Sequence, residues 1–234
     1  MWGYYNYYFD PTYFLVILGL ILCLSASGMV KATYSRYSEV YASRHLTGAE
    51  AAQRILYQAG IHDVRIEQVS GELTDHYDPR AKVLRLSALN YNTSSVAAIG
   101  VAAHEAGHAI QHDKGYFPLK VRNAILPVAN LGSQFGVPLV IIGLIFSFGD
   151  TLINIGIFMF AFAVLFQIVT LPVEFNASKR AIKMLEEQEI LYSEELRGCK
   201  KVLSAAAMTY VAAAASSVLQ LLRLVILGGR RRRD

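Results

Sequence analysis

Val96–His112 has the sequence VAAIGVAAHEAGHAIQH, which places His104, Glu105 and His108 in the spacing H-E-x-x-H. Residues four apart lie on the same face of a helix, so both imidazoles can bind one ion at a Zn–N distance of about 2.1 Å. Glu105 is turned by about 100° from His104, so it can reach a water on the ion without binding the ion itself. The stretch therefore predicts a zinc site with a general base beside it.

The residues around this stretch favour a helix. Asn92, Thr93 and Ser94 offer side-chain oxygens for an N-cap, and Gly115 is suited to the C-terminal end. Gly107 costs about 1 kcal/mol relative to alanine inside a helix, so we expect a neighbouring element to pack closely against it. The alternative is an alanine-rich, membrane-adjacent helix whose two histidines are satisfied by hydrogen bonds alone.

The composition indicates a membrane protein. The 234 residues are 54% hydrophobic and have a mean hydropathy of +0.34, which exceeds what an ordinary soluble domain requires. Cys23 and Cys199 are far apart in sequence, so neither a disulfide framework nor a thiolate zinc site is expected. The chain has no glycine-rich phosphate loop and no basic-aromatic pattern, so we expect no nucleic-acid partner.

The sequence predicts a mainly α membrane protein with a small α+β domain, arranged in five regions. These are residues 1–30, with an aromatic belt and a first transmembrane helix at Tyr13–Val30; residues 31–122, a cytoplasmic α+β domain that contains the H-E-x-x-H helix; residues 125–171, a transmembrane helical hairpin; residues 172–203, a cytoplasmic helical segment; and residues 204–234, an apolar helix with a basic tail. No basic segment precedes the first span, so we expect a retained anchor with its N-terminus outside.

Positive charges set the expected orientation. Lys31 and Arg36 follow the first span, and Lys120 and Arg122 precede the next, which predicts that residues 31–122 are cytoplasmic. The hairpin comprises the apolar runs Ile125–Phe148 and Leu152–Leu171, joined by a predicted turn at residues 149–151.

Two features of the apolar C-terminal half leave alternatives open. Pro127, Gly132, Gly136 and Pro138 interrupt the first run of the hairpin, where they could kink the helix or line a polar cavity. Ser204–Leu227 either crosses the membrane a fourth time or lies at the interface, with the arginines of residues 230–233 on anionic lipid.

Local signals predict the small domain. Thr47 and Glu50 form a capping-box pattern that opens a helix through Tyr57, which ends at Gly60. Residues 64–66 and 83–86 are predicted as two short strands on either side of a polar stretch at residues 70–80.

A catalytic zinc site needs a third protein ligand. His112 lies about 12 Å along the helix from His104, so it cannot share the ion. Asp150 falls in the predicted hairpin turn, on the other side of the membrane. Glu174 follows the returning span on the same side as the histidine pair, so it is the predicted third ligand. The remaining histidines, His45, His62 and His76, are expected at the surface or behind the ligands.

Three segments carry a resemblance to a known family. They are HEAGHAIQ at residues 104–111, LPVEFNASKRA at residues 171–181 and DHYDPRAKVLRLS at residues 75–87. Together they resemble the YugP-type membrane zinc metallopeptidases of bacteria over most of the chain. The resemblance implies peptide hydrolysis at a bacterial inner membrane.

The chain departs from a related pattern at one position. The HtpX-like gluzincin peptidases have E-x-x-A-D where this chain has Glu174-Phe-Asn-Ala-Ser178, so Ser178 replaces an aspartate that orients a ligating histidine. Asn176, Asp113 or a backbone carbonyl could take that role.

The expected function is that of an integral-membrane zinc endopeptidase acting on polypeptides at the cytoplasmic face, with a gluzincin-like domain. One Zn²⁺ is expected on His104, His108 and Glu174, with Glu105 as the base. Lys82–Ser87 is predicted as an edge strand for the substrate backbone. The candidates for stabilising the oxyanion are His76, Tyr91, His112 and Arg180. Two alternatives stay open: a site-2-type intramembrane protease that uses Asp150, and a non-catalytic metal-binding scaffold.

Overall fold

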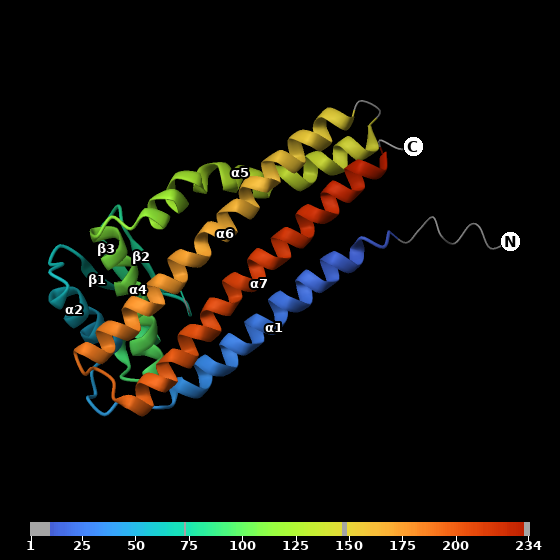
Figure 1. The fold of residues 1–234 in the computed structure, drawn as a ribbon. Helices are drawn as coiled ribbons and strands as arrows, with labels where there is room; N and C mark the ends of the chain where they lie inside the picture. The colour runs from blue at the N-terminus through green and yellow to red at the C-terminus, as the bar shows by residue number, and fades with distance from the viewer. Residues whose placement is uncertain (1–9, 73, 147–148, 232–234) are drawn as a thin grey trace. The chain divides into compact units, whose positions relative to one another are not determined.

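The computed structural model describes residues 10–72, 74–146 and 149–231. Its helices are α1 (Tyr13–Ser38), α2 (Gly48–Gln58), α3 (Ala88–Asn92), α4 (Val96–Asp113), α5 (Phe117–Ile145), α6 (Gly149–Glu187) and α7 (Ser193–Arg231), and its strands are β1 (Arg65–Val69), β2 (His76–Asp78) and β3 (Val83–Ser87) (Figure 1). The predicted combination of a mainly helical chain and a small sheet is confirmed. The predicted aromatic belt lies largely outside the described residues.

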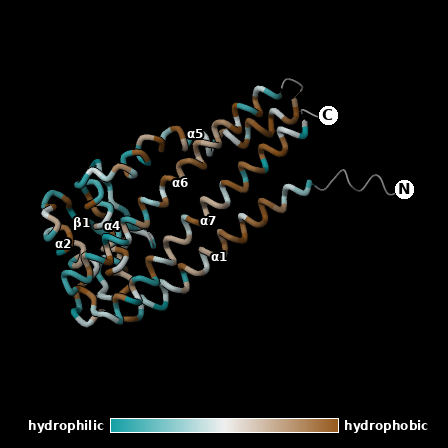
Figure 2. The backbone as a smooth tube through the Cα atoms, in the orientation of Figure 1, coloured by the Kyte–Doolittle hydropathy of each residue, from teal (hydrophilic) through white to brown (hydrophobic). Residues whose placement is uncertain are grey.

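Four helices, α1, α5, α6 and α7, are long and apolar enough to cross a membrane. Hydrophobic residues predominate along most of their length (Figure 2). A crossing needs about 20 residues, and all four helices exceed that length. The helix that the sequence left undecided therefore also qualifies as a span by length and composition. It begins at Ser193 rather than Ser204, and α6 continues through Pro172 to Glu187.

The predicted hairpin turn at residues 149–151 is wrong by a few residues. Helix α6 begins at Gly149, and Asp150 lies in its first turn, where a carboxylate is favourable to the helix dipole. Helix α5 continues through Pro127 and Pro138. A Cβ atom at Gly132 would collide with the backbone oxygen of Met159, so this glycine allows α5 to pack on α6 and does not line a cavity.

The chain divides into two compact units. The first comprises residues 1–25, 121–170 and 210–234 and contains parts of the four long helices. Its buried core includes Val140, Ile153, Phe160 and Leu224.

The second unit comprises residues 26–120 and 171–209 and contains the sheet. The strand order is β1-β3-β2; β1 pairs with β3 in parallel, and β2 pairs with β3 antiparallel. The prediction that Lys82–Ser87 is an edge strand is therefore wrong, because β3 has a neighbour on each side. Its position is explained by the burial of Val83, Leu84 and Leu86, which belong in the middle of a packed sheet.

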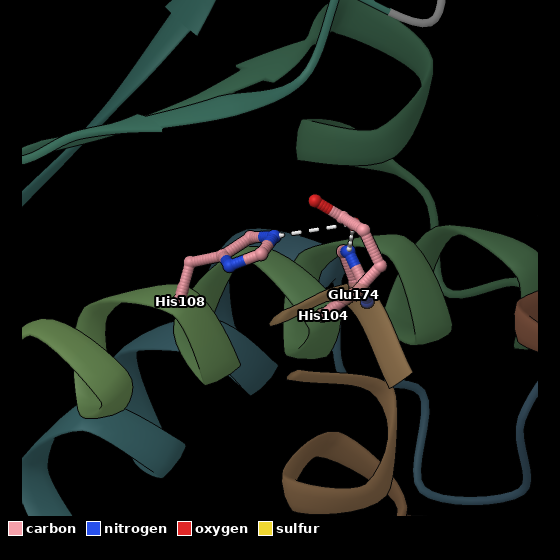
Figure 3. A group of neighbouring side chains, drawn as sticks. All are labelled: His104, His108 and Glu174. Carbon is pink, nitrogen blue, oxygen red and sulfur yellow. Dashed lines mark hydrogen bonds and ion pairs between the residues drawn. The ribbon is translucent and has the colours of Figure 1, made fainter. Parts of the chain in front are cut away.

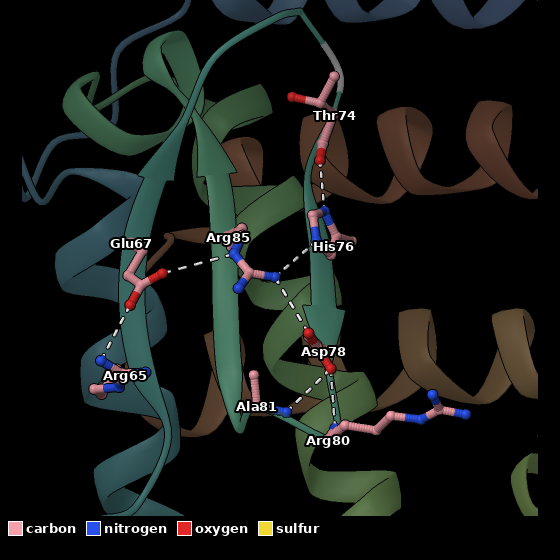
Figure 4. Close-up of polar contacts among 8 residues, drawn as sticks. All are labelled: Arg65, Glu67, Thr74, His76, Asp78, Arg80, Ala81 and Arg85. Carbon is pink, nitrogen blue, oxygen red and sulfur yellow. Dashed lines mark hydrogen bonds and ion pairs between the residues drawn. The ribbon is translucent and has the colours of Figure 1, made fainter.

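The third strand, β2, forms within the polar stretch that was expected to separate two strands. Arg85 on β3 links the three strands, because its guanidinium forms ion pairs with Glu67 of β1 at 3.6 Å and with Asp78 of β2 at 3.3 Å (Figure 4). Asp78 also accepts hydrogen bonds from the backbone N–H groups of Ala81 and Arg80, which lower its pKa. Side-chain charges thus hold β2 in place where apolar alternation is absent.

Helix α2 forms where the capping-box pattern predicts it. Thr47 and Glu50 form the reciprocal hydrogen bonds of a capping box, and the chain leaves the helix at Gly60, whose φ is +78°. Ala51 and Ile55 are fully buried in the core of the second unit, together with Leu84 and Ile99. The core therefore fixes α4 against α2 and the sheet.

Candidate metal centre

The N-cap of helix α4 lies one residue after the last of the three predicted candidates, Asn92, Thr93 and Ser94. Ser95 is the N-cap, and its hydroxyl accepts a hydrogen bond from the backbone N–H of Ala98 at 3.2 Å. Asn92 and Thr93 are unavailable because they end the short helix α3. The C-terminal prediction is confirmed, since Gly115 follows the last turn with a φ of +60°.

Gly107 lies between the two histidines and faces α6. A Cβ atom at this position would lie 2.6 Å from the backbone oxygen of Ala177, so any larger residue would force the two helices apart. The expected packing reason for this glycine is thereby found. The close approach brings the face of α6 that carries Glu174 onto the histidine pair.

His104, His108 and Glu174 point toward one another from α4 and α6 (Figure 3). Nε2 of His104 lies 3.2 Å from Oε2 of Glu174, and Nε2 of His108 lies 3.5 Å from the same oxygen. Within the described part of the chain, they form the one group of three or more histidine, cysteine or acidic side chains that could hold a metal ion.

These separations fit a zinc ion. Ligand atoms at about 2.05 Å from a tetrahedral zinc lie about 3.3 Å from one another. The two nitrogen-to-oxygen distances of 3.2 and 3.5 Å bracket that value. Two imidazoles and one carboxylate also match the donor set of a catalytic zinc site, which has three protein ligands.

The site is largely withdrawn from solvent. Glu174 is 3% exposed and Glu105 is 9% exposed. Burial alone lowers the pKa of His108, but hydrogen bonding to Glu174 and the negative charges of Glu105 and Glu174 outweigh it and raise the pKa. The concentrated negative charge favours a cation in this position.

Each histidine is oriented by a further side chain. Nδ1 of His104 lies 3.1 Å from the hydroxyl of Ser178, and Nδ1 of His108 lies 3.0 Å from Oε1 of Gln111. The amide nitrogen of Gln111 donates to the backbone oxygen of Val173 and to Asn176, so its Oε1 must accept from His108. Nδ1 of His108 therefore carries the proton, and Nε2 is left to bind a metal.

The partner of His108 was missed by the sequence reasoning. Gln111 is fully buried, and its spacing of three residues from His108 on one helix was the available signal. Ser178 contacts His104 despite being shorter than an aspartate. Asn176 contacts Gln111 and Arg180 instead of a histidine, and Asp113 forms an ion pair with Lys114.

The other candidate residues lie outside the group of three. His112 pairs with the hydroxyl of Tyr77, His62 packs on Tyr57, and His76 contacts Thr74 and Arg85. Among the candidates for oxyanion stabilisation, Arg180 donates to Asn176 at 2.7 Å. Tyr91 packs against the core of the second unit.

Comparisons with known proteins agree with this geometry. A family model described as "Putative neutral zinc metallopeptidase" matches residues 12–228. The chain is 48% identical over 199 residues to the "Putative membrane protease YugP" of Bacillus subtilis (strain 168), a match that covers 85% of this chain and 88% of that protein. No solved structure matches. With its family model spanning nearly the whole sequence, the chain belongs to the "Putative neutral zinc metallopeptidase" family.

Proposed function

We propose that the chain is an integral-membrane zinc endopeptidase that cleaves protein substrates at the cytoplasmic face of a bacterial cell membrane. The observation that carries the proposal is the convergence of His104, His108 and Glu174, whose two nitrogen-to-oxygen distances suit tetrahedral zinc. The membrane-protease name of the Bacillus subtilis relative supports the same reaction class.

The two histidines would hold zinc through Nε2, and Glu174 through a carboxylate oxygen. When bound, zinc supplies a Lewis acid that polarises the scissile carbonyl and makes water more acidic. Glu105 accepts a proton from the attacking water and returns it to the leaving amine nitrogen. Gln111 and Ser178 keep the imidazoles in the required orientation, because they fix the Nδ1 side of each ring.

The substrate backbone would pair with β2. This strand lies at one edge of the sheet, and it contacts α4, which carries the histidines. An extended peptide can add to an exposed strand edge through main-chain hydrogen bonds. β2 therefore takes the role that the sequence assigned to Lys82–Ser87.

The two alternative functions have less support. A site-2-type intramembrane protease would use Asp150 as the third ligand, whereas Glu174 already lies within 3.5 Å of both histidines. A structural metal site has no need of a further buried carboxylate, and Glu105 is buried beside the histidine pair.

Substitution of Glu105 tests the proposal. Glu105→Gln is expected to keep about one equivalent of zinc while peptide hydrolysis falls by about 10²- to 10⁴-fold, because only the proton transfer is removed. His108→Ala is expected to lose both zinc and activity. Zinc is measured by elemental analysis of the purified protein, and hydrolysis with an unstructured protein substrate such as casein.

Glu186→Gln is the matched control, since Glu186 is an exposed carboxylate on α6. It should keep both zinc and activity. A Glu105→Gln protein that cleaves at the rate of the unaltered protein would contradict the proposed mechanism.

A further inference from the structure

Two grooves lie on either side of α7 within the second unit. One, of about 530 Å³, lies between α1 and α7 and is lined by Met29, Ala205 and Met208 together with three cations. The other, of about 450 Å³, lies between α6 and α7 and includes Phe175, Ile182 and Leu203. Both volumes fall in the range of binding sites for small molecules, about 300–1,000 Å³.

The two grooves share one ridge of α7. Lys200, Ser204 and Met208 line both of them. Because these residues are four positions apart, they follow one face of the helix, with a positive charge at one end and an apolar side chain at the other. A ligand with one anionic group and two apolar arms could therefore place the anion at Lys200 and one arm in each groove.

The positive charges of the first groove come from Arg36, Lys200 and Lys201. Among the described residues, no acidic side chain forms an ion pair with any of the three. Of the acidic residues on α6 and α7, Glu194 pairs with Arg197 and Glu187 with Lys183. Lys179 adds a further positive charge to the second groove. The cluster therefore favours an anionic ligand.

The apolar part of the grooves faces outward on helices that are candidate membrane spans. Met29 and Met208 are each 43% exposed, and Phe175 is 49% exposed. Arg36 follows the apolar run of α1, and Lys200 and Lys201 precede the apolar run of α7. This order of charge and apolar surface is that of a membrane-water interface, where basic pockets between transmembrane helices bind anionic headgroups.

We propose that these grooves hold one anionic phospholipid, with its phosphate at the cluster of Arg36, Lys200 and Lys201 and one acyl chain in each groove. A zwitterionic lipid is disfavoured, because its ammonium group would face the same unneutralised cations. Ser178, which contacts His104, is among the residues that line the second groove. The proposal does not rest on the proteolytic function, because lipid binding is measured directly and requires neither metal nor hydrolysis.

The test is lipid retention by the purified full-length protein in detergent. Phosphatidylglycerol and phosphatidylcholine with identical acyl chains are titrated separately, and bound lipid is counted by native mass spectrometry. One phosphatidylglycerol is expected to bind tightly, with phosphatidylcholine bound clearly more weakly. The double variant Lys200→Gln/Lys201→Gln is expected to bind phosphatidylglycerol about 30-fold more weakly, at about 1 kcal/mol per basic residue.

Two further variants keep the result interpretable. Arg54→Gln/Arg80→Gln removes the same charge from exposed positions outside both grooves and should bind as the unaltered protein does. Met208→Glu leaves the three cations in place but puts a carboxylate in the apolar part, so it should also weaken binding.

Several results would overturn the proposal. These are equal binding of the two lipids, unchanged binding by both groove variants, an equal loss in the Arg54/Arg80 control, or binding of glycerol phosphate as tight as that of the whole lipid. Circular dichroism of each variant separates a lost site from a lost fold.

Discussion

At the residue scale, the choice between Glu174 and Asp150 as the third zinc ligand separates the proposed function from the site-2-type alternative. Glu174 and Asp150 both lie on α6, about 36 Å apart along the helix at 1.5 Å per residue. A carboxylate that distant cannot bind an ion held by His104 and His108, which lie beside Glu174. We therefore predict that Glu174→Ala strips or greatly weakens zinc binding, whereas Asp150→Asn leaves zinc and proteolysis near those of the unaltered protein. Elemental analysis of both purified variants measures this, and the reverse pattern would overturn the assignment.

A second prediction at the residue scale concerns the effect of Gln111 on zinc affinity. Its amide both accepts from His108 and donates to the backbone oxygen of Val173, next to Glu174, so it ties α4 to α6. Gln111→Leu keeps the approximate shape but removes these bonds, and we predict a loss of zinc affinity of about 10- to 100-fold. Competition with a chelator of known affinity measures it. Gln53→Leu on the exposed face of α2 is the control, and equal affinities in all three proteins would contradict a positioning role for Gln111.

At the scale of elements, an ion pair joins the start of α1 to the end of α7 within the first unit. Asp10 lies 3.8 Å from Arg223 and 3.1 Å from Arg230, with only 24% of its side chain exposed. Burial raises its pKa, but hydrogen bonds from Thr12 and the two arginine charges outweigh burial and lower the pKa below 3.8. The stabilisation is therefore fully present above about pH 4 and is lost as the pH falls through the lowered pKa.

The lowered pKa of Asp10 leads to a prediction about how stability depends on pH. Asp10→Asn should destabilise the protein by about 1 kcal/mol or less at neutral pH, and the difference should shrink below about pH 4. Thermal unfolding in detergent at several pH values measures it, with Asp113→Asn as a control for an exposed carboxylate. A difference that grows with acidification would mean that the charge of Asp10 is not the stabilising feature.

At the scale of the whole molecule, the same ion pair bears on membrane topology. Arg230 forms an ion pair with Asp10. We therefore infer that the C-terminal end of α7 and the N-terminal end of α1 lie on the same side of the membrane, as four crossings require. Most other basic residues precede or follow the spans on the opposite side, which predicts a cytoplasmic peptidase domain. Arg230, at the start of the basic tail, pairs with Asp10 of the same chain, which favours a fourth crossing over an interfacial position for α7.

Reporter fusions test this topology. A fusion after Arg85 should report a cytoplasmic location, and fusions after Phe146 and at the C-terminus should report the outside. A cytoplasmic C-terminal reporter together with an outside reporter after Phe146 would instead support an interfacial or re-entrant α7. A reporter after Arg85 on the outside would reverse the predicted sidedness while leaving the metal site possible.

The sequence by itself determined the features that depend on a few neighbouring residues. The H-E-x-x-H spacing, the capping box at Thr47 and the end of α4 at Gly115 follow from helix geometry and from local hydrogen bonds. Apolar run length likewise indicated the spans, because a bilayer of fixed thickness requires helices of a minimum length. Topological reasoning also selected Glu174, which the structure brings to the histidines.

Only the tertiary structure decided which partners those local elements meet. It placed β3 between β1 and β2, gave His108 the amide of Gln111, and extended α7 back to Ser193. Each outcome depends on the packing of segments far apart in sequence, and their spacing along the chain does not specify it. Burial selects these partners, because a buried strand edge or imidazole needs its hydrogen bonds satisfied by whichever group the fold brings within reach.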